Sequence, residues 1–137
     1  MNITELREHL CETYPQLCPL FSIEFGDGVL AVEAGDLHEA AENLRDLGFD
    51  RLGMVTAVDH PPHHIEAVYR LQSRSMSAAL FLKCLLDRGA PRVASLCDVW
   101  PAALWQEREV FEMFGVVFDG HPDLRPLLLP EGSEGHP

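Results

Sequence analysis

Residues 99–115 read VWPAALWQEREVFEMFG, and the rest of the chain is organised around this segment. It predicts a helix. Pro101 suits the first helical position, where a missing N–H would have no intrahelical partner anyway, and Gly115 supplies a left-handed stop. Large apolar residues recur at helical spacing and predict one buried stripe. This stripe comprises Ala103, Val110 and Phe114, with Met113 alongside.

Large apolar and charged residues also occupy another side of this helix. Arg108 and Glu112 are spaced as an i, i+4 pair, and Trp105 and Glu109 lie beside them. We expect Trp105 to be buried, either inside the domain or against a partner. A helix with large apolar residues beyond one stripe usually contacts more than one surface, so this segment indicates a role in an assembly.

The chain of 137 residues is long enough for one domain with a sizeable core. Its formal net charge of −12 argues against nucleic-acid binding, which needs a basic surface. The charge is uneven, because residues 1–50 carry 2 basic and 11 acidic side chains whereas residues 51–95 carry 6 and 3. No apolar run approaches the ~20 residues of a membrane-spanning helix, and no secretory signal is expected.

Four cysteines stand at positions 11, 18, 84 and 97 without the C-x-x-C spacing of many metal and redox sites. Cytoplasmic proteins usually keep their cysteines reduced. We therefore expect free, mostly buried thiols.

The remaining elements are predicted from hydrophobic period and turn residues. Asn2 and Glu5 form a capping-box pattern for an N-terminal helix, and Asp36 and Glu39 repeat it for a second helix that Gly48 ends. Strands are predicted at residues 21–25, 29–33, 52–58 and 65–71. The strand at 52–58 is apolar on both alternating sets and is expected to be central in the sheet.

Residues 77–86 are ambiguous, because their Ala, Leu and Lys content favours a helix on propensity. If they form a third consecutive strand, the order becomes α-β-β-α-β-β-β-α. That order belongs to the α+β class, with a mixed or antiparallel sheet.

Carboxylates and histidines are the residues that could form a chemical site. Glu107, Glu109 and Glu112 share one helix, but the first two point to different faces, and a di-iron motif needs Glu-x-x-His. A closed zinc site needs four ligands, which the group His60, His63 and His64 does not complete. The cysteines are too dispersed for an iron–sulfur cluster. We therefore expect no catalytic residue and no metal or cofactor site in this chain.

A longer pattern surrounds the same helix. Glu107-Arg108-Glu109, Glu112 to Gly115 and the run from His121 to Arg125 stand in fixed spacing, preceded by Trp100 to Ala103 and followed by matches in residues 130–137. Over about forty residues the chain resembles the C subunit of respiratory complex I. It departs from that pattern at Pro126, where a second basic residue is usual, and at Gly132-Ser133. It also stops at Pro137, before the family's basic tail.

The resemblance implies a non-redox scaffold in the peripheral arm of the proton-pumping NADH:quinone oxidoreductase. Such a protein packs against the quinone-site subunit, of the D type, on the cytoplasmic side of the cell membrane. NADH, flavin, iron–sulfur clusters and quinone would belong to other subunits of the complex. The resemblance also implies a strand at residues 77–86. The alternatives are the equivalent subunit of a related membrane-bound hydrogenase or dehydrogenase, and, more remotely, a stand-alone acid/base or metal enzyme.

The matched residues are the candidates for interface or structural roles. They are Glu107, Arg108, Glu109, Glu112, His121, Asp123, Leu124 and Arg125. We expect residues 1–125 to form one α+β domain and residues 126–137 to form an extended Pro/Gly-rich segment ordered by a partner.

The segment from His121 to Pro126 contains two prolines, which favour an extended path over the surface. Leu124 would be an apolar anchor and Arg125 a charged contact to the neighbouring subunit. Asp123 would contact the partner or cap the local backbone. The alternative is a loop that only closes the domain.

Overall fold

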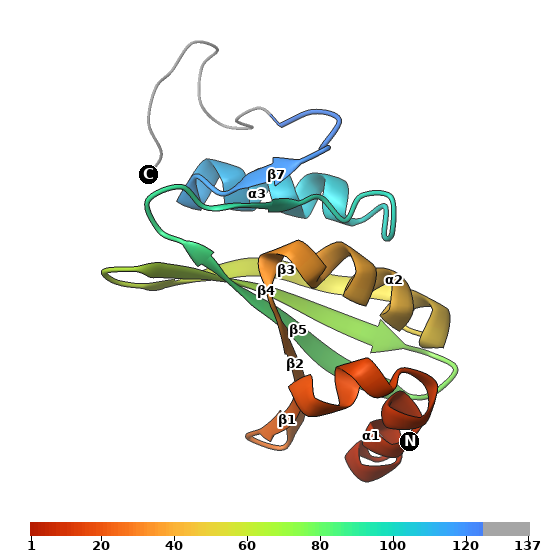
Figure 1. Cartoon of the computed structure of the whole chain (residues 1–137). Coiled ribbons are helices and arrows are strands. Elements are labelled where there is room, and N and C mark those ends of the chain that lie inside the picture. The colour runs from red at the N-terminus through yellow and green to blue at the C-terminus, as the bar shows by residue number, and fades with distance from the viewer. Residues whose placement is uncertain (125–137) are drawn as a thin grey trace.

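The computed structural model describes residues 1–124 and has two unequal parts (Figure 1). Arg125 and the predicted extended segment 126–137 lie outside the described residues. The larger part contains α1 (Ile3–Thr13), η1 (Pro15–Leu20), β1 (Phe21–Glu24), β2 (Asp27–Val32), η2 (Ala34–Asp36), α2 (Leu37–Leu47), β3 (Arg51–His60), β4 (His64–Ser73) and β5 (Ala78–Asp87). The smaller part contains β6 (Arg92–Ala94), α3 (Ala103–Phe114) and β7 (Val117–Asp119).

The main sheet has five strands in the order β1-β2-β5-β4-β3. β2 pairs with β5 in parallel, and all other neighbours in this sheet are antiparallel. The α+β class and the mixed sheet are confirmed, and the predicted order α-β-β-α-β-β-β-α is found with two short strands added, β6 before the last helix and β7 after it. The third consecutive strand implied for residues 77–86 is also confirmed, as β5.

The central position predicted for residues 52–58 is wrong, because β3 lies at an edge of the sheet. Val55 and Ala57 face the core, whereas Met54 and Val58 are exposed on the opposite face. Helix α3 runs beside this edge, and the Val55 N–H donates a 2.6 Å hydrogen bond to Gln106 Oε1. The second apolar set thus faces solvent on an edge strand, and β5 takes the centre of the sheet.

One hydrophobic core lies between the sheet and the two N-terminal helices. Leu6 and Leu10 of α1 pack there with four buried residues of α2, Leu37, Ala40, Ala41 and Leu44, and Leu47 of α2 is partly buried against the core. From the strands the core receives one alternating set of side chains, including Leu30, Tyr69 and Leu82. Both helices therefore cover the same face of the sheet, as Figure 1 shows.

The helix boundaries follow the cap residues only in part. Asn2 Oδ1 accepts a 2.9 Å hydrogen bond from the Glu5 N–H, which confirms the first predicted cap. Asp36 stands at the N-cap of α2 but makes no side-chain cap bond. Gly48 and Gly115 end their helices with φ values of +133° and +74°, a region that glycine enters without steric cost.

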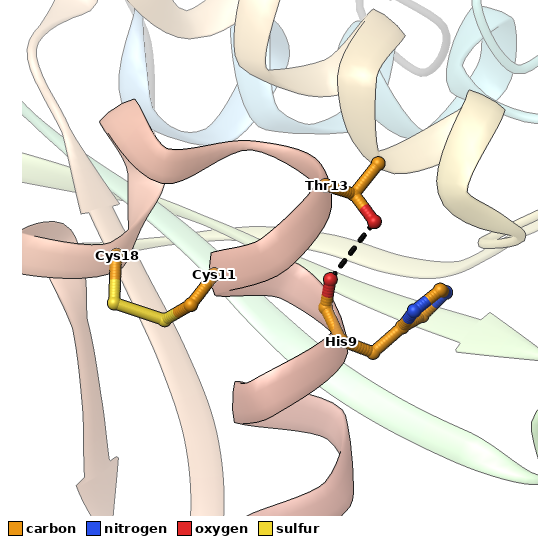
Figure 2. Close-up of a disulfide and its surroundings, with 4 residues drawn as sticks. All are labelled: His9, Cys11, Thr13 and Cys18. Carbon is orange, nitrogen blue, oxygen red and sulfur yellow. Dashed lines mark hydrogen bonds between the residues drawn. A yellow bond between two sulfur atoms is a disulfide. The ribbon is translucent and has the colours of Figure 1, made fainter.

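The expectation of free thiols is wrong for Cys11 and Cys18, which form a disulfide (Figure 2). Helix α1 ends at Thr13 and the 3₁₀ helix η1 doubles back beside it, which brings the two Cα atoms to 4.8 Å. The spacing of the cysteines in the sequence does not reveal that reversal. Cys84 is free and buried, and Cys97 is free and half-buried.

The smaller part is a β6–α3–β7 unit whose two short strands pair in parallel. Strands β6 and β7 are not among the predicted elements. Helix α3 starts at Ala103, two residues after the predicted Pro101, because a stretch of turns over residues 97–102 precedes it. Trp100 is buried in that stretch, and its Nε1–H donates a 2.9 Å hydrogen bond to the Phe49 carbonyl. Trp100 thereby ties the unit to the main core.

Candidate functional site

Glu107 points from α3 into the protein and is fully buried. Ser95 Oγ donates a 2.6 Å hydrogen bond to its Oε1, and the Leu96 N–H donates a 2.8 Å bond to its Oε2. Burial raises the pKa of Glu107, and the hydrogen bonds from Ser95, Leu96 and Cys97 partly oppose that rise. The carboxylate therefore fastens the turn after β6 to α3.

The inward face of α3 differs from the predicted stripe. Ala103, Glu107 and Val110 (i, i+4, i+7) are buried, while Met113 and Phe114 are 53% and 36% exposed. The prediction that the latter two are buried is wrong. A buried carboxylate occupies the place on this face that the apolar pattern assigns to a hydrophobic side chain, so the helix is rotated relative to the predicted stripe.

Of the two alternatives for Trp105, burial inside the domain is wrong, because its side chain is 59% exposed, and burial against a partner stays a prediction. The Arg108 guanidinium lies over the indole, with Cζ 5.1 Å from the ring centroid. Glu109 is exposed next to it, and Glu112 is buried. Trp105 and Met113, two turns apart, place a large apolar surface on the solvent side of α3.

His121 fixes the start of the segment that follows β7. Its Nε2 lies 2.8 Å from the Leu104 carbonyl, and its Nδ1 accepts a 2.9 Å hydrogen bond from the Asp123 N–H. The tautomer that satisfies both bonds carries its proton on Nε2. The carboxylate of Asp123 also lies 3.7 Å from Arg108 Nη1, and Leu124 packs against the core while partly buried.

The structure thus brings together four of the predicted residues around α3: Glu107, Arg108, His121 and Asp123. The i, i+4 pair of Arg108 with Glu112 stays a prediction. Arg125 lies outside the described residues. Partner contacts of all these residues likewise stay predictions.

Cys97, Glu107 and His121 form a cluster that the sequence does not predict, because their positions have no motif spacing. Their potential ligand atoms lie within 4.8 Å of one another. Hydrogen bonds within the chain already engage both Glu107 oxygens and both ring nitrogens of His121. The Cys97 thiol donates a 3.4 Å bond to Glu107 Oε1, and burial raises its pKa to about 11. The arrangement fits a protonated structural network better than an activated nucleophile.

The histidines near residue 60 lie at the β3–β4 turn. His60 Nε2 is 3.6 Å from Glu66 Oε1, and the rings of His63 and His64 meet edge to face. Within residues 1–124, they do not gather with other donors into a metal-ligand group.

Comparison with known proteins gives a consistent family. The sequence profile described as respiratory-chain NADH dehydrogenase, 30 kDa subunit, matches residues 30–137. The NADH-quinone oxidoreductase C subunit of Moorella thermoacetica is 44% identical over 121 residues, which cover 84% of this chain and 82% of that protein. The C subunit of Rhizobium johnstonii is 36% identical, over 98% of this chain and 70% of that protein. The chain spans about half the length of some longer relatives, such as 49% of the C subunit of Saccharopolyspora erythraea.

Two solved structures share the fold. A trypsin-resistant fragment of Nqo5 superposes with a TM-score of 0.71 and 26% identity, covering 88% of this chain and 97% of the fragment. A chain of the membrane-bound sulfane sulfur reductase, an archaeal respiratory membrane complex, superposes with a TM-score of 0.80 and 24% identity. The superposition covers 94% of this chain and 78% of that chain. No helix among the described residues is long and apolar enough to cross a membrane. On the profile match and the identities with the relatives named above, this chain belongs to the 30 kDa subunit family of the respiratory-chain NADH dehydrogenase.

Proposed function

We propose that this chain is a non-redox structural subunit in the peripheral arm of a proton-pumping NADH:quinone oxidoreductase, on the cytoplasmic side of the membrane. It docks against the protein that forms the quinone site, of the D type. Electron transfer from NADH to quinone is carried out by the whole complex. The names of its relatives support the complex, and the exposed apolar side of α3 supports the docking role.

The docking surface is the α3 band, which we define as Trp105, Glu109 and Met113. Its two apolar members are 59% and 53% exposed. Aromatic and methionine side chains are enriched at the cores of protein interfaces, where they bury large areas. Exposing them on one side of a single helix has no benefit for the isolated domain, so the α3 band favours a protein partner.

Arg108 and Asp123 make this surface rigid before it binds. The guanidinium lies over the Trp105 ring and reaches Asp123 on the segment after β7. The Arg108 side chain is only 12% exposed, so water screens these contacts less than on an open surface. A side chain already held in its bound position loses less conformational entropy on docking. The segment from His121 to Leu124 is held by the contacts of His121 with Leu104 and of Asp123 with Arg108. The next residue in the sequence is Arg125, the proposed charged contact.

A non-redox role fits the cysteine chemistry. The sequence has four cysteines, and two of them are joined in the disulfide. An iron–sulfur cluster generally needs four cysteine ligands, and burial raises the pKa of Cys84 to about 12. We therefore propose that the flavin, the clusters and the bound NADH and quinone all belong to other subunits.

The test compares Trp105→Ala with Leu85→Ala, which removes a similarly exposed apolar side chain from the open face of the sheet. Each purified chain is added to membranes of the source organism from which the native chain has been deleted, and the bound fraction is measured. Trp105→Ala should weaken capture by about 2 kcal/mol, as for an interface hot spot, and should leave the melting temperature of the isolated chain nearly unchanged. Arg125→Ala should act similarly.

Equal capture of wild type and Trp105→Ala would contradict docking through the α3 band. Mass spectrometry of the captured assembly then tests the complex itself. If the chain is recovered with hydrogenase-type subunits, in an assembly that does not oxidise NADH, the alternative of a related membrane-bound hydrogenase would be favoured.

A further inference from the structure

The turn of the β1–β2 hairpin carries an aromatic side chain, Phe25, that does not contribute to the buried core. Strands β1 and β2 are joined by Phe25 and Gly26, which have φ values of +51° and +84°. Phe25 is fully exposed. In Figure 1 this hairpin extends from the end of the molecule opposite to α3.

Phenylalanine at this position is unfavourable in two independent ways. A two-residue turn with positive φ at both positions favours Asn-Gly, Asp-Gly or Gly-Gly, because side chains with a bulky Cβ substituent are strained there. An exposed aromatic ring also leaves its whole apolar surface in water. An asparagine would relieve both effects. A residue that costs the isolated fold twice is best explained by a contact outside the chain.

The surroundings of Phe25 define the chemistry of that contact. Glu24 and Asp27 flank the turn and are exposed, and Ile23 on the same hairpin is nearly half exposed. Lys83 lies 3.7 Å from Glu24, but that carboxylate remains about half exposed. The turn belongs to the N-terminal third of the chain, whose excess of acidic residues is the largest: 11 acidic against 2 basic in residues 1–50. The surface is therefore an apolar projection with an acidic rim.

We propose that Phe25 is an aromatic anchor that inserts into an apolar pocket rimmed by lysine or arginine on another protein of the same assembly. Aromatic anchors seated in pockets dominate many interfaces, and complementary charges around them select the partner. A second copy of this acidic chain, or an anionic lipid surface, would meet like charge. The inference rests on the proposed assembly but uses a different surface from the α3 band, so the chain would contact its complex at two opposite ends.

The test exploits the strain in the turn. Phe25→Asn should raise the melting temperature of the isolated chain by about 3 °C, because the new residue suits the turn. In the membrane capture assay the same variant should bind at least about tenfold more weakly. Ser77→Asn is the matched control, since Ser77 is also a non-glycine residue with positive φ (+48°) and is exposed. It should leave capture unchanged.

A photoreactive benzophenone analogue of phenylalanine at position 25 identifies the occupant. We expect a crosslink to a surface of another protein of the complex that carries lysine or arginine. The proposal would be overturned if position 25 crosslinks only to lipid or only to a second copy of this chain. It would also be overturned if the yield of crosslinks at position 25 is no higher than with the same analogue at position 77. Normal capture of Phe25→Asn would also overturn it. If Phe25→Asn loses capture while Trp105→Ala retains it, this inference stands and docking through the α3 band fails; the reverse result rejects this inference alone.

Discussion

The two parts of the molecule bury polar groups in opposite ways. In the main core, Tyr69 is fully buried, and its hydroxyl has no hydrogen-bond partner among the described residues. In the β6–α3–β7 unit, Glu107 is just as buried, but Ser95, Leu96 and Cys97 donate to its carboxylate. The main core thus leaves the Tyr69 hydroxyl without a hydrogen-bond partner among the described residues, whereas the smaller unit supplies three hydrogen-bond donors to the Glu107 carboxylate.

This difference separates two ways in which packing fixes a structure: non-directional burial of apolar area and directional hydrogen bonding. Burial of apolar area is non-directional and tolerates changes of similar shape. A buried carboxylate with three donors accepts only one position of the helix relative to the turn that supplies them. We infer that the main core supplies most of the stability, while the Glu107 network sets the position of α3 and hence the orientation of the α3 band.

The largest effect should come from the apolar core. Leu82 lies on the central strand β5 and is fully buried. Leu82→Ala should lower the free energy of unfolding by about 4 kcal/mol, through lost transfer energy and a cavity. Leu85→Ala, on the exposed face of the same strand, should cost less than about 1 kcal/mol. Urea unfolding measures both, and similar losses would contradict the one-sided core.

The Glu107 network should give the next largest effect. Glu107→Ala leaves the donors of Ser95 and Leu96 without their buried acceptor, which should cost about 3 kcal/mol. Because the network positions α3, the variant should also bind less well in the membrane capture assay when it is folded. Glu109→Ala, an exposed neighbour on α3, is the control for stability. A loss of stability with unchanged capture would show that the network does not orient the α3 band.

The smallest effect has the opposite sign. Tyr69→Phe removes the unpaired hydroxyl and keeps the ring, so it should raise the free energy of unfolding by about 1 kcal/mol. Burial also raises the pKa of Tyr69 well above its ordinary value, so the phenol is neutral in the folded chain at neutral pH. A loss of stability on this substitution would show that the hydroxyl has a partner in solution and would remove the contrast with Glu107.

The order of elements followed from the sequence because period and turn chemistry are local. The capping residue Asn2 and the stops at Gly48 and Gly115 all depend on neighbours within a few residues. The identity of β5 as a strand did not follow from propensity, which favoured a helix there. It came from the family resemblance, and the pairing of β5 with both β2 and β4 explains why tertiary context overrides propensity.

The features that the sequence did not reveal depend on distant neighbours. The edge position of β3 is set by β5 pairing with β2, and the disulfide is set by the reversal between α1 and η1. Of the candidate site, the resemblance selected Glu107, Arg108, His121 and Asp123, which lie close to one another around α3. It did not show that Glu107 faces inward or that Trp105 faces outward. Both depend on the rotation of α3, which donors elsewhere in the chain decide.

The parallel pairing of β2 with β5 has a consequence for the order of folding. Gly28 pairs with Leu80, across two intervening strands and a helix. Contacts between such distant positions require the closure of a long loop and form slowly, whereas β3, β4 and β5 are joined by short turns. We expect the β3–β4–β5 meander to form first and the β1–β2 hairpin to add last. On the ribosome, the hairpin therefore stays without its parallel neighbour until β5 has emerged, and an unpaired edge of that kind is exposed to aggregation.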